Sequence, residues 1–313
     1  MPKPLLIVVI PVFNEEPVLP ELLRRITAVF DSLSDLNCEA VFVDDGSRDR
    51  SVALLTEASA RDPRLRLVQL SRNFGHQAAL TAGLAEAGDG DAIITMDADL
   101  QDPPELIPAL VSAWLEGAEV VLAVRRSRED SGLRRLGFDT FHRLFKHASD
   151  FDLKANTGTF GLLGKEALKA FGLLREKHRF FPGLRAWVGF VQAEVIYDRK
   201  ERAAGTPGQT FRRLVRYALD GLFSFSHLPL RLVTYSGLLI AGAGFATGVF
   251  FAIRRLLGQE TAFTGFTTLV TLILFLGGIQ LIGIGVLGEY LGRIYEEVKR
   301  RPLYVVKRPP PAR

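Results

Sequence analysis

The sequence predicts an α/β domain built on a mostly parallel sheet, followed by an amphipathic juxtamembrane helix and two transmembrane helices. Three observations support this fold class. Short apolar runs alternate with segments of helical periodicity over the first two thirds of the chain. Two long uncharged stretches follow, and basic residues gather before and after them.

Five short apolar runs are the predicted strands. They are rich in Val, Ile and Leu, as expected of strands that are buried on both faces of a sheet. They occupy residues 5–10, 40–43, 65–70, 92–96 and 120–124. The predicted helices between them are residues 19–33, a helix through Leu55, residues 76–87, and residues 105–115 after Pro103-Pro104. Ser47 or Asp49 is expected to cap the second helix.

A polar motif follows each predicted strand. These motifs are Asn14-Glu15, Asp44-Asp45, Ser71-Arg72-Asn73, Asp97-Ala98-Asp99 and Arg125-Arg126. The carboxyl ends of parallel strands meet at one edge of the sheet, where ligands bind. One polar loop would be unremarkable, but five at successive strand ends favour a binding site.

Asp97 and Asp99 are the candidate metal ligands. Two acids one residue apart, at the end of an apolar strand, can both reach one cation, and Gln101 can add a carbonyl oxygen. Hard oxygen ligands of this type suit Mg²⁺ or Mn²⁺. The cation would bridge diphosphate oxygens and neutralise the charge of a leaving group.

Other strand ends carry groups that suit a nucleotide and phosphates. Asp44 and Asp45 can accept hydrogen bonds from a base or from ribose hydroxyls, with helix capping as the alternative for one of them. Guanidinium groups hold phosphates through paired N–H donors. The arginines that follow the fifth strand are Arg125, Arg126, Arg134 and Arg135.

Two uncharged stretches predict two membrane crossings. Residues 232–253 carry no charge, and a second such stretch lies between Glu260 and Glu289; about 20 apolar residues span a bilayer as a helix. Residues 211–225 have apolar side chains on one side and arginines elsewhere, which predicts a helix lying on the membrane surface. The basic residues outside the two crossings place both chain ends in the cytoplasm.

The predicted organisation has four parts. They are a cytoplasmic domain (1–207), the amphipathic helix (208–228), a membrane unit (229–290, with helices at about 231–253 and 266–288) and a basic cytoplasmic tail (291–313). The net charge is +4, and its basic residues flank the apolar stretches, which favours a membrane surface over nucleic acid as partner. The single cysteine, Cys38, fits a reducing compartment, and no signal peptide is expected.

The strand-end motifs resemble those of glycosyltransferase family 2. The matching runs are residues 9–16 (VIPVFNEE), 43–47 (VDDGS), 71–75 (SRNFG) and 96–104 (MDADLQDPP). Within that family the chain looks like the polyprenyl-phosphate sugar transferases, which include dolichyl-phosphate mannose synthase and bacterial polyprenyl-phosphate glucosyltransferases. The resemblance covers nearly the whole chain. Its motifs are specific for the family and poorly specific for the sugar.

The resemblance implies a nucleotide-diphospho-sugar fold of the GT-A type and a role for individual residues. The nucleotide-sugar ligands would be Pro11, Phe13, Glu15, Asp44, Asp45 and Asp97. The metal ligands would be Asp97, Asp99 and Gln101, and the catalytic residues Asp99, Arg125 and Arg202. Arg202 matches a basic residue ahead of the juxtamembrane helix, and with Arg134 and Arg135 it is expected to bind the lipid phosphate.

The implied activity is transfer of glucose or another hexose from a nucleotide-diphospho-sugar to a polyprenyl phosphate, with inversion. The donor would be of the UDP-glucose or GDP-mannose class, and Mg²⁺ or Mn²⁺ would be required. The reaction would take place at the cytoplasmic face of the inner cell membrane, among its lipids. The motifs leave open the sugar, the nucleotide, the polyprenol and whether the chain forms a homo-oligomer.

One segment departs from the family pattern. Many relatives carry an acid and an arginine where this chain has Asn156, Thr159 and Gly161, so no catalytic base is assigned there. A phosphate monoester has a second pKa near ~6 and is mostly a dianion at neutral pH. Such a nucleophile needs positioning and charge screening more than deprotonation.

Two other functions stay open at this point. A processive polysaccharide synthase would carry a Gln-x-x-Arg-Trp motif and more membrane helices, and only Leu184-Arg185-Ala186-Trp187 is similar. A non-catalytic membrane scaffold with this fold is disfavoured by the intact Asp45, Asp97 and Asp99. Nucleic-acid binding is disfavoured because the basic residues flank the apolar stretches and no recognised motif for it is present.

Overall fold

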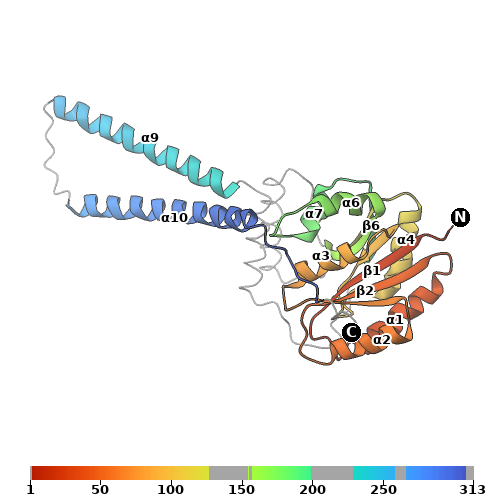
Figure 1. The fold of residues 1–313 in the computed structure, drawn as a ribbon. Helices are drawn as coiled ribbons and strands as arrows, with labels where there is room; N and C mark the ends of the chain where they lie inside the picture. Colours follow the sequence, from red (N-terminus) through yellow and green to blue (C-terminus); the bar gives the residue numbers. More distant parts are fainter. Residues whose placement is uncertain (1, 127–153, 155–156, 199–227, 258–265, 308–313) are drawn as a thin grey trace.

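The computed structural model describes residues 2–126, 154, 157–198, 228–257 and 266–307 (Figure 1). Residues 208–227 of the predicted amphipathic helix (208–228) lie outside these residues, and Leu228 begins the next helix. Asn156 and three arginines of the predicted site, namely Arg134, Arg135 and Arg202, also lie outside the described residues. Their predicted roles stay predictions.

A seven-stranded, mostly parallel sheet forms the centre of the domain, as predicted. Its strands are β1 (Leu5–Val12), β2 (Asn37–Asp44), β3 (Leu65–Gln69), β4 (Ala92–Thr95), β5 (Val120–Arg125), β6 (Thr157–Gly164) and β7 (Gln192–Tyr197). The strand order is β3-β2-β1-β4-β6-β5-β7. Only β6 runs against its neighbours, between β4 and β5. The five predicted strands therefore all point the same way.

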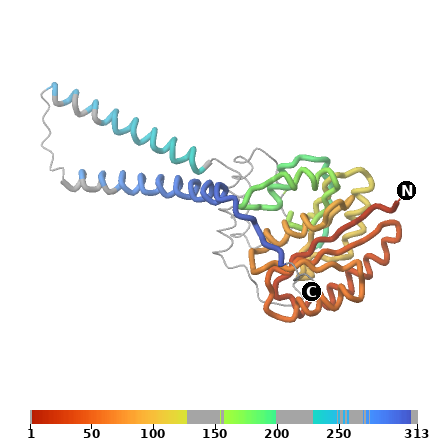
Figure 2. The backbone as a smooth tube through the Cα atoms, viewed as in Figure 1, coloured from red at the N-terminus to blue at the C-terminus, as the bar shows by residue number. Residues whose placement is uncertain are grey.

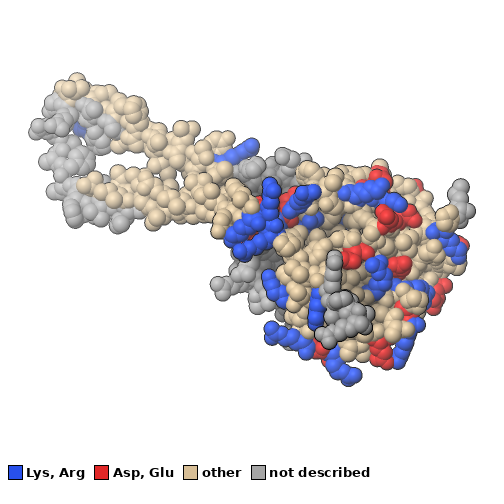
Figure 3. All heavy atoms as spheres, in the orientation of Figure 1, with Lys and Arg blue, Asp and Glu red and all other residues tan. Residues whose placement is uncertain are grey.

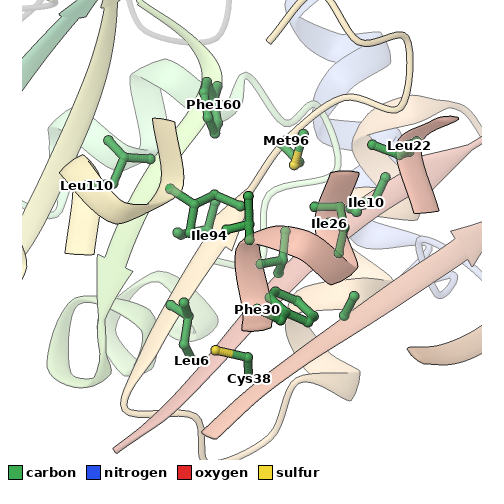
Figure 4. Close-up of a cluster of buried hydrophobic side chains, with 14 of the residues drawn as sticks. Leu6, Ile10, Leu22, Ile26, Phe30, Cys38, Ile94, Met96, Leu110 and Phe160 are labelled. Atoms are coloured by element: carbon green, nitrogen blue, oxygen red, sulfur yellow. The ribbon is translucent and has the colours of Figure 1, made fainter. Parts of the chain in front are cut away.

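Helices cover both faces of the sheet. They are α1 (Leu19–Ser32), α2 (Ser51–Arg61), α3 (His76–Glu86), η1 (Pro104–Leu106), α4 (Ile107–Leu115), α6 (Lys165–Leu173) and α7 (Phe181–Trp187). One apolar cluster packs α1, α2 and α4 against one face, and Figure 4 shows Leu22, Ile26 and Phe30 of α1 in it. The second cluster packs α3, α6 and α7 against the other face.

The helices and strands up to β5 lie where the sequence predicts them, but those between β5 and α9 were not predicted. Sequence patterns gave no strand at β6 or β7 and no helix at α6 or α7. β6 holds three glycines in eight residues and lacks the β-branched run of a typical buried strand. The cap prediction was wrong, because the N-cap of α2 is Arg50, although Asp49 Oδ1 just before it accepts a hydrogen bond from Ser51 N (3.0 Å). Ser47 instead accepts from Asn14 N through its hydroxyl.

Helix α3 approaches the sheet closely at Gly83. A Cβ there would lie 2.2 Å from Val9 Cγ1 and 2.9 Å from Val43 Cγ2. We expect Gly83→Ala to lower the free energy of unfolding by about 1–3 kcal/mol, because β-branched neighbours in a packed core cannot move aside cheaply. Denaturant unfolding of the purified protein in detergent measures the change.

Gly172 provides the matched control for that substitution. It lies in α6, and a Cβ there would meet nothing within 4 Å. Gly172→Ala should leave the protein equally stable or up to ~1 kcal/mol more stable, because alanine favours the helix. Equal losses in the two variants would contradict the close packing at Gly83.

Two long helices extend away from the domain (Figure 1). They are α9 (Leu228–Leu256) and α10 (Phe266–Val298). Each contains a stretch long and apolar enough to cross a membrane, Pro229–Thr247 and Phe275–Val298, and these stretches are 0% and 6% buried within the protein. Apolar surface of this extent needs an apolar environment, which indicates association with a membrane.

Helix α10 is longer than the predicted second membrane helix, which ended at about residue 288. The membrane unit was expected to end at 290 and a tail to follow, but the helix continues to Val298. The chain after it then returns to the domain (Figure 2). Ser71 N donates to Val305 O (2.8 Å) and Lys307 N to Gln69 O (2.7 Å), so the tail pairs with the open edge beside β3. The tail is thus a structural part of the domain.

Candidate active site

The loops after β1 and β2 are joined by hydrogen bonds at the carboxyl edge of the sheet. Asn14 has a positive φ of 55°, and its side chain accepts from Arg48 N (2.8 Å). Glu15 N donates to Ser51 Oγ (3.0 Å), which ties the first loop to the start of α2. Of the predicted nucleotide ligands on this strand, Pro11 is buried at its end and Phe13 is 43% exposed.

The two acids at the end of β2 are buried and have different partners. Asp44 accepts hydrogen bonds from Gly46 N and Ser47 N and so shapes its own loop. Asp45 accepts from Phe74 N (2.7 Å) and Gly75 N (2.9 Å), which fixes the loop before α3. Burial raises the pKa of Asp45, and these two N–H groups oppose the rise. A nucleotide bound here would share the carboxylates with the loop backbone.

Asp97 lies at the centre of the strand-end motifs. Its Oδ1 accepts hydrogen bonds from His76 Nε2 (2.9 Å), at the start of α3, and from Thr159 Oγ1 (3.1 Å), on β6. Burial alone would raise the pKa of Asp97, but the His76 hydrogen bond and charge, with the Thr159 hydroxyl, lower it to about 2. Asp97 is therefore a carboxylate at neutral pH.

Asp99 lies two residues further on and is 8% exposed. Its Oδ1 accepts from Gln101 N (3.1 Å), and Leu100 between them has a positive φ of 58°. This turn brings the Gln101 N–H back to the Asp99 carboxylate. The Gln101 contact is through its backbone.

These residues fit a divalent cation that is shared with a substrate. Among the described residues, no group of three His, Cys, Asp or Glu side chains forms a complete metal site. Mg²⁺ and Mn²⁺ sites commonly need only one or two carboxylates, with substrate phosphates and water as the other ligands. Both hydrogen bonds to Asp97 use Oδ1, which leaves Oδ2 for such a cation.

Arg125 is held in place from two sides at the end of β5. Its Nε donates to Tyr197 Oη (3.1 Å), and its Nη2 lies 3.7 Å from Oδ1 of the fully buried Asp102. The Tyr197 hydroxyl in turn donates to Asp102. A Cβ on Gly158 would lie 2.7 Å from Arg125 Nη2, so this glycine leaves room for the guanidinium. The arginine is therefore a fixed positive charge beside β6.

Sequence reasoning missed several residues that the fold brings to this site. His76 was taken only as a helix start, and Tyr197 and Asp102 were not considered. The segment with Thr159 was noted for its lack of acids, yet its hydroxyl reaches Asp97 directly. A histidine at the first turn after the Ser-Arg-Asn-Phe-Gly loop was the one available signal, because that loop also follows a strand end.

The solved structures similar to this chain define the class of fold. Glucosyl-3-phosphoglycerate synthase from Mycobacterium tuberculosis, in complex with Mn²⁺, uridine-diphosphate and phosphoglyceric acid, matches with a TM-score of 0.51 and 19% identity. The match covers 70% of this chain and 76% of that chain. The domain is a GT-A type fold, as predicted.

The chain belongs to glycosyltransferase family 2. The family model described as Glycosyl transferase family 2 matches residues 7–172. The uncharacterized glycosyltransferase YkcC of Bacillus subtilis is 43% identical over 302 residues, which cover 96% of this chain and 93% of that protein. The bactoprenol glucosyl transferase of Shigella phage SfII is 42% identical over 301 residues, 96% of each chain. The protein is therefore a glycosyltransferase.

Proposed function

We propose that this protein transfers a hexose, glucose in the first instance, from a nucleotide-diphospho-sugar to a polyprenyl phosphate. One observation carries the proposal: the chain matches a bactoprenol glucosyl transferase over 96% of its length at 42% identity. This chain has both acids of the strand-end motif, Asp97 and Asp99. The two exposed apolar helices supply the membrane association that a lipid acceptor requires.

The proposed donor is a nucleotide sugar of the UDP-glucose class. The M. tuberculosis structure with the same fold was solved with Mn²⁺ and uridine-diphosphate. We place the nucleotide over the ends of β1 and β2, with Pro11, Phe13 and Glu15 on one side and Asp44 and Asp45 on the other. Asp97 would face its diphosphate.

The proposed cofactor is one divalent cation, Mg²⁺ or Mn²⁺, held by Asp97, Asp99 and Gln101. When bound, it would neutralise negative charge on the diphosphate leaving group. His76 and Thr159 hold the Asp97 carboxylate in one orientation through its Oδ1. The protein thereby fixes the ligand geometry in advance, which is the main source of electrostatic catalysis.

The acceptor needs orientation more than activation. A lipid phosphate is mostly dianionic at neutral pH, since its second pKa is near ~6. The acid that many relatives carry is absent from the segment that forms β6. In this segment the Thr159 hydroxyl donates a hydrogen bond to Asp97 and so orients it. Arg125 would screen the repulsion between acceptor phosphate and donor diphosphate. Arg134, Arg135 and Arg202 would add further positive charge on the acceptor side.

A direct assay tests the function. The purified protein in detergent, given labelled UDP-glucose, polyprenyl phosphate and Mn²⁺, should form a labelled lipid that mild acid releases as free sugar. A panel of other nucleotide sugars identifies the donor. Absence of lipid product with every donor would overturn the proposal, and polymeric product would favour a processive synthase.

The proposed topology places the catalytic domain in the cytoplasm and both apolar helices across the inner membrane. Basic residues before α9 and after α10 outnumber those in the connecting segment, and the positive-inside bias then sets the orientation. We expect a reporter fused after Arg313 to be cytoplasmic and one inserted at Gln259 to be external. The reverse pattern would contradict the topology.

A further inference from the structure

A pocket of about 620 Å³ lies between the domain and the end of α10. Three segments line it: the start of α3, the loop before α7, and the last turn of α10 with the residues after it. His76 also lines the pocket, and its imidazole forms the hydrogen bond to Asp97. The pocket therefore connects the end of an apolar helix with the carboxylates of the candidate active site.

Positive charge dominates the lining of this pocket. Four cationic side chains contribute to it, namely Lys177, Arg179, Lys299 and Arg301, against a single carboxylate, Glu296. Figure 3 shows Lys and Arg side chains gathered where α10 meets the domain. Gathering like charges is unfavourable unless an anion accompanies them.

The cations of the pocket form no salt bridge among the described residues, and Glu176 exerts a weaker electrostatic effect on Arg179. Arg179 Nη1 donates to Leu174 O, and Lys177 Nζ donates to the Glu296 carbonyl. Lys299 Nζ lies 3.9 Å from the centre of the Tyr295 ring. The Glu296 carboxylate itself faces His178, 2.9 Å away. The positive charge around the pocket is thus available to an external anion.

The apolar span of α10 ends near this pocket, and the exposed apolar side chains at that end lie on the helix face opposite Glu296, which lines the pocket. Leu287, Leu291, Ile294 and Val298 follow one another at helical spacing and are 48%, 64%, 57% and 70% exposed. The first charge after the apolar stretch is Glu289, and the helix rises about 14 Å from there to its end at ~1.5 Å per residue. The phosphate of a lipid whose chain lies beside the apolar span would therefore be within about 14 Å of the pocket, measured along the helix axis.

We propose that this pocket receives the phosphate of the lipid acceptor, held by Lys177, Arg179, Lys299 and Arg301. This inference rests on the proposed transfer to a lipid phosphate and adds a binding site to it. The phosphate then waits beside His76, next to Asp97 and the donor diphosphate. Residues after α10 thereby become part of the acceptor site.

The test uses the full-length protein in nanodiscs of phosphatidylcholine, with UDP-glucose and polyprenyl phosphate. The double variant Lys299→Gln/Arg301→Gln should raise KM for polyprenyl phosphate about tenfold or more, since each cation near a lipid phosphate contributes on the order of 1 kcal/mol. KM for UDP-glucose should stay within about twofold, because neither residue forms a hydrogen bond or salt bridge with the strand-end carboxylates among the described residues.

Arg300→Gln is the matched control. Arg300 lies between the two substituted residues, has the same charge, and does not line the pocket. Its KM for polyprenyl phosphate should stay within about twofold of the unsubstituted protein. If the double variant does not fold, Arg301→Gln alone carries the test. Its guanidinium makes no hydrogen bond among the described residues, and we expect a KM rise of roughly fivefold.

The possible outcomes separate the two proposals. If the unsubstituted protein transfers no sugar to polyprenyl phosphate, the proposed function fails. If it does transfer sugar and the double variant keeps its KM, the pocket inference alone fails. A KM change that appears only when phosphatidylglycerol is added would also overturn the inference, because the cations would then bind bulk anionic headgroups.

Discussion

Asp99→Asn should lower kcat by about 10²-fold or more, which is the cost of removing one electrostatic stabiliser of a transition state. Asp99 is buried in the loop after β4, and the turn at Leu100 brings Gln101 N to its carboxylate. An amide keeps the shape and the hydrogen bond from Gln101 N but removes the charge that a divalent cation requires. Excess chelator should abolish transfer by the unsubstituted protein, and added Mn²⁺ or Mg²⁺ should restore it.

Asp89→Asn is the control for this substitution. Asp89 is exposed and lies three residues before β4, at the opposite edge of the sheet. Asp89→Asn removes the same charge far from the site, so the rate of sugar transfer should stay within about twofold of that of the unsubstituted protein. Full activity of Asp99→Asn, or of the unsubstituted protein in excess chelator, would remove the metal from the mechanism.

Arg125→Ala should also lower kcat/KM by about 10²-fold, because a fixed guanidinium that contacts phosphates supplies bidentate, charge-assisted hydrogen bonds. Tyr197 and Asp102 hold Arg125 beside β6, so the guanidinium group is already in position before the reaction begins. Burial raises the pKa of Asp97, and the His76 and Thr159 contacts lower it. The positive charge of Arg125 lowers it further, by a smaller amount. Steady-state kinetics with both substrates varied measures the loss.

Arg126→Ala separates a specific role from general charge. Arg126 is the next residue, but its side chain is 69% exposed and paired with the exposed Asp198 at 3.3 Å. Exposed pairs of this kind contribute ~1 kcal/mol or less, so its kinetics should change by no more than about threefold. Tyr197→Phe keeps the Arg125 charge and should lose less than Arg125→Ala. Equal losses at Arg125 and Arg126 would show that only the net charge of this edge matters.

The sequence alone was sufficient for the first half of the domain and for the two long apolar helices. Both depend on local patterns: apolar runs of strand length, helical periodicity, and long uncharged stretches that each report on their own segment. The polar motifs after β1, β2 and β4 could be assigned to one edge because parallel strands place their carboxyl ends together. Asp97 and Asp99 followed from that rule and from the family motifs.

Only the tertiary structure decided the rest, because it depends on contacts between residues far apart in the chain. Strand β6 enters between β4 and β5 and brings Thr159 to Asp97, 62 residues away. The bond from His76 to Asp97 arises because α3 begins beside the end of β4. The tail after α10 pairs beside β3, which closes the pocket against the start of α3. The periodicity of a segment indicates which of its faces is buried. Which other segment packs against that face depends on the fold of the whole chain.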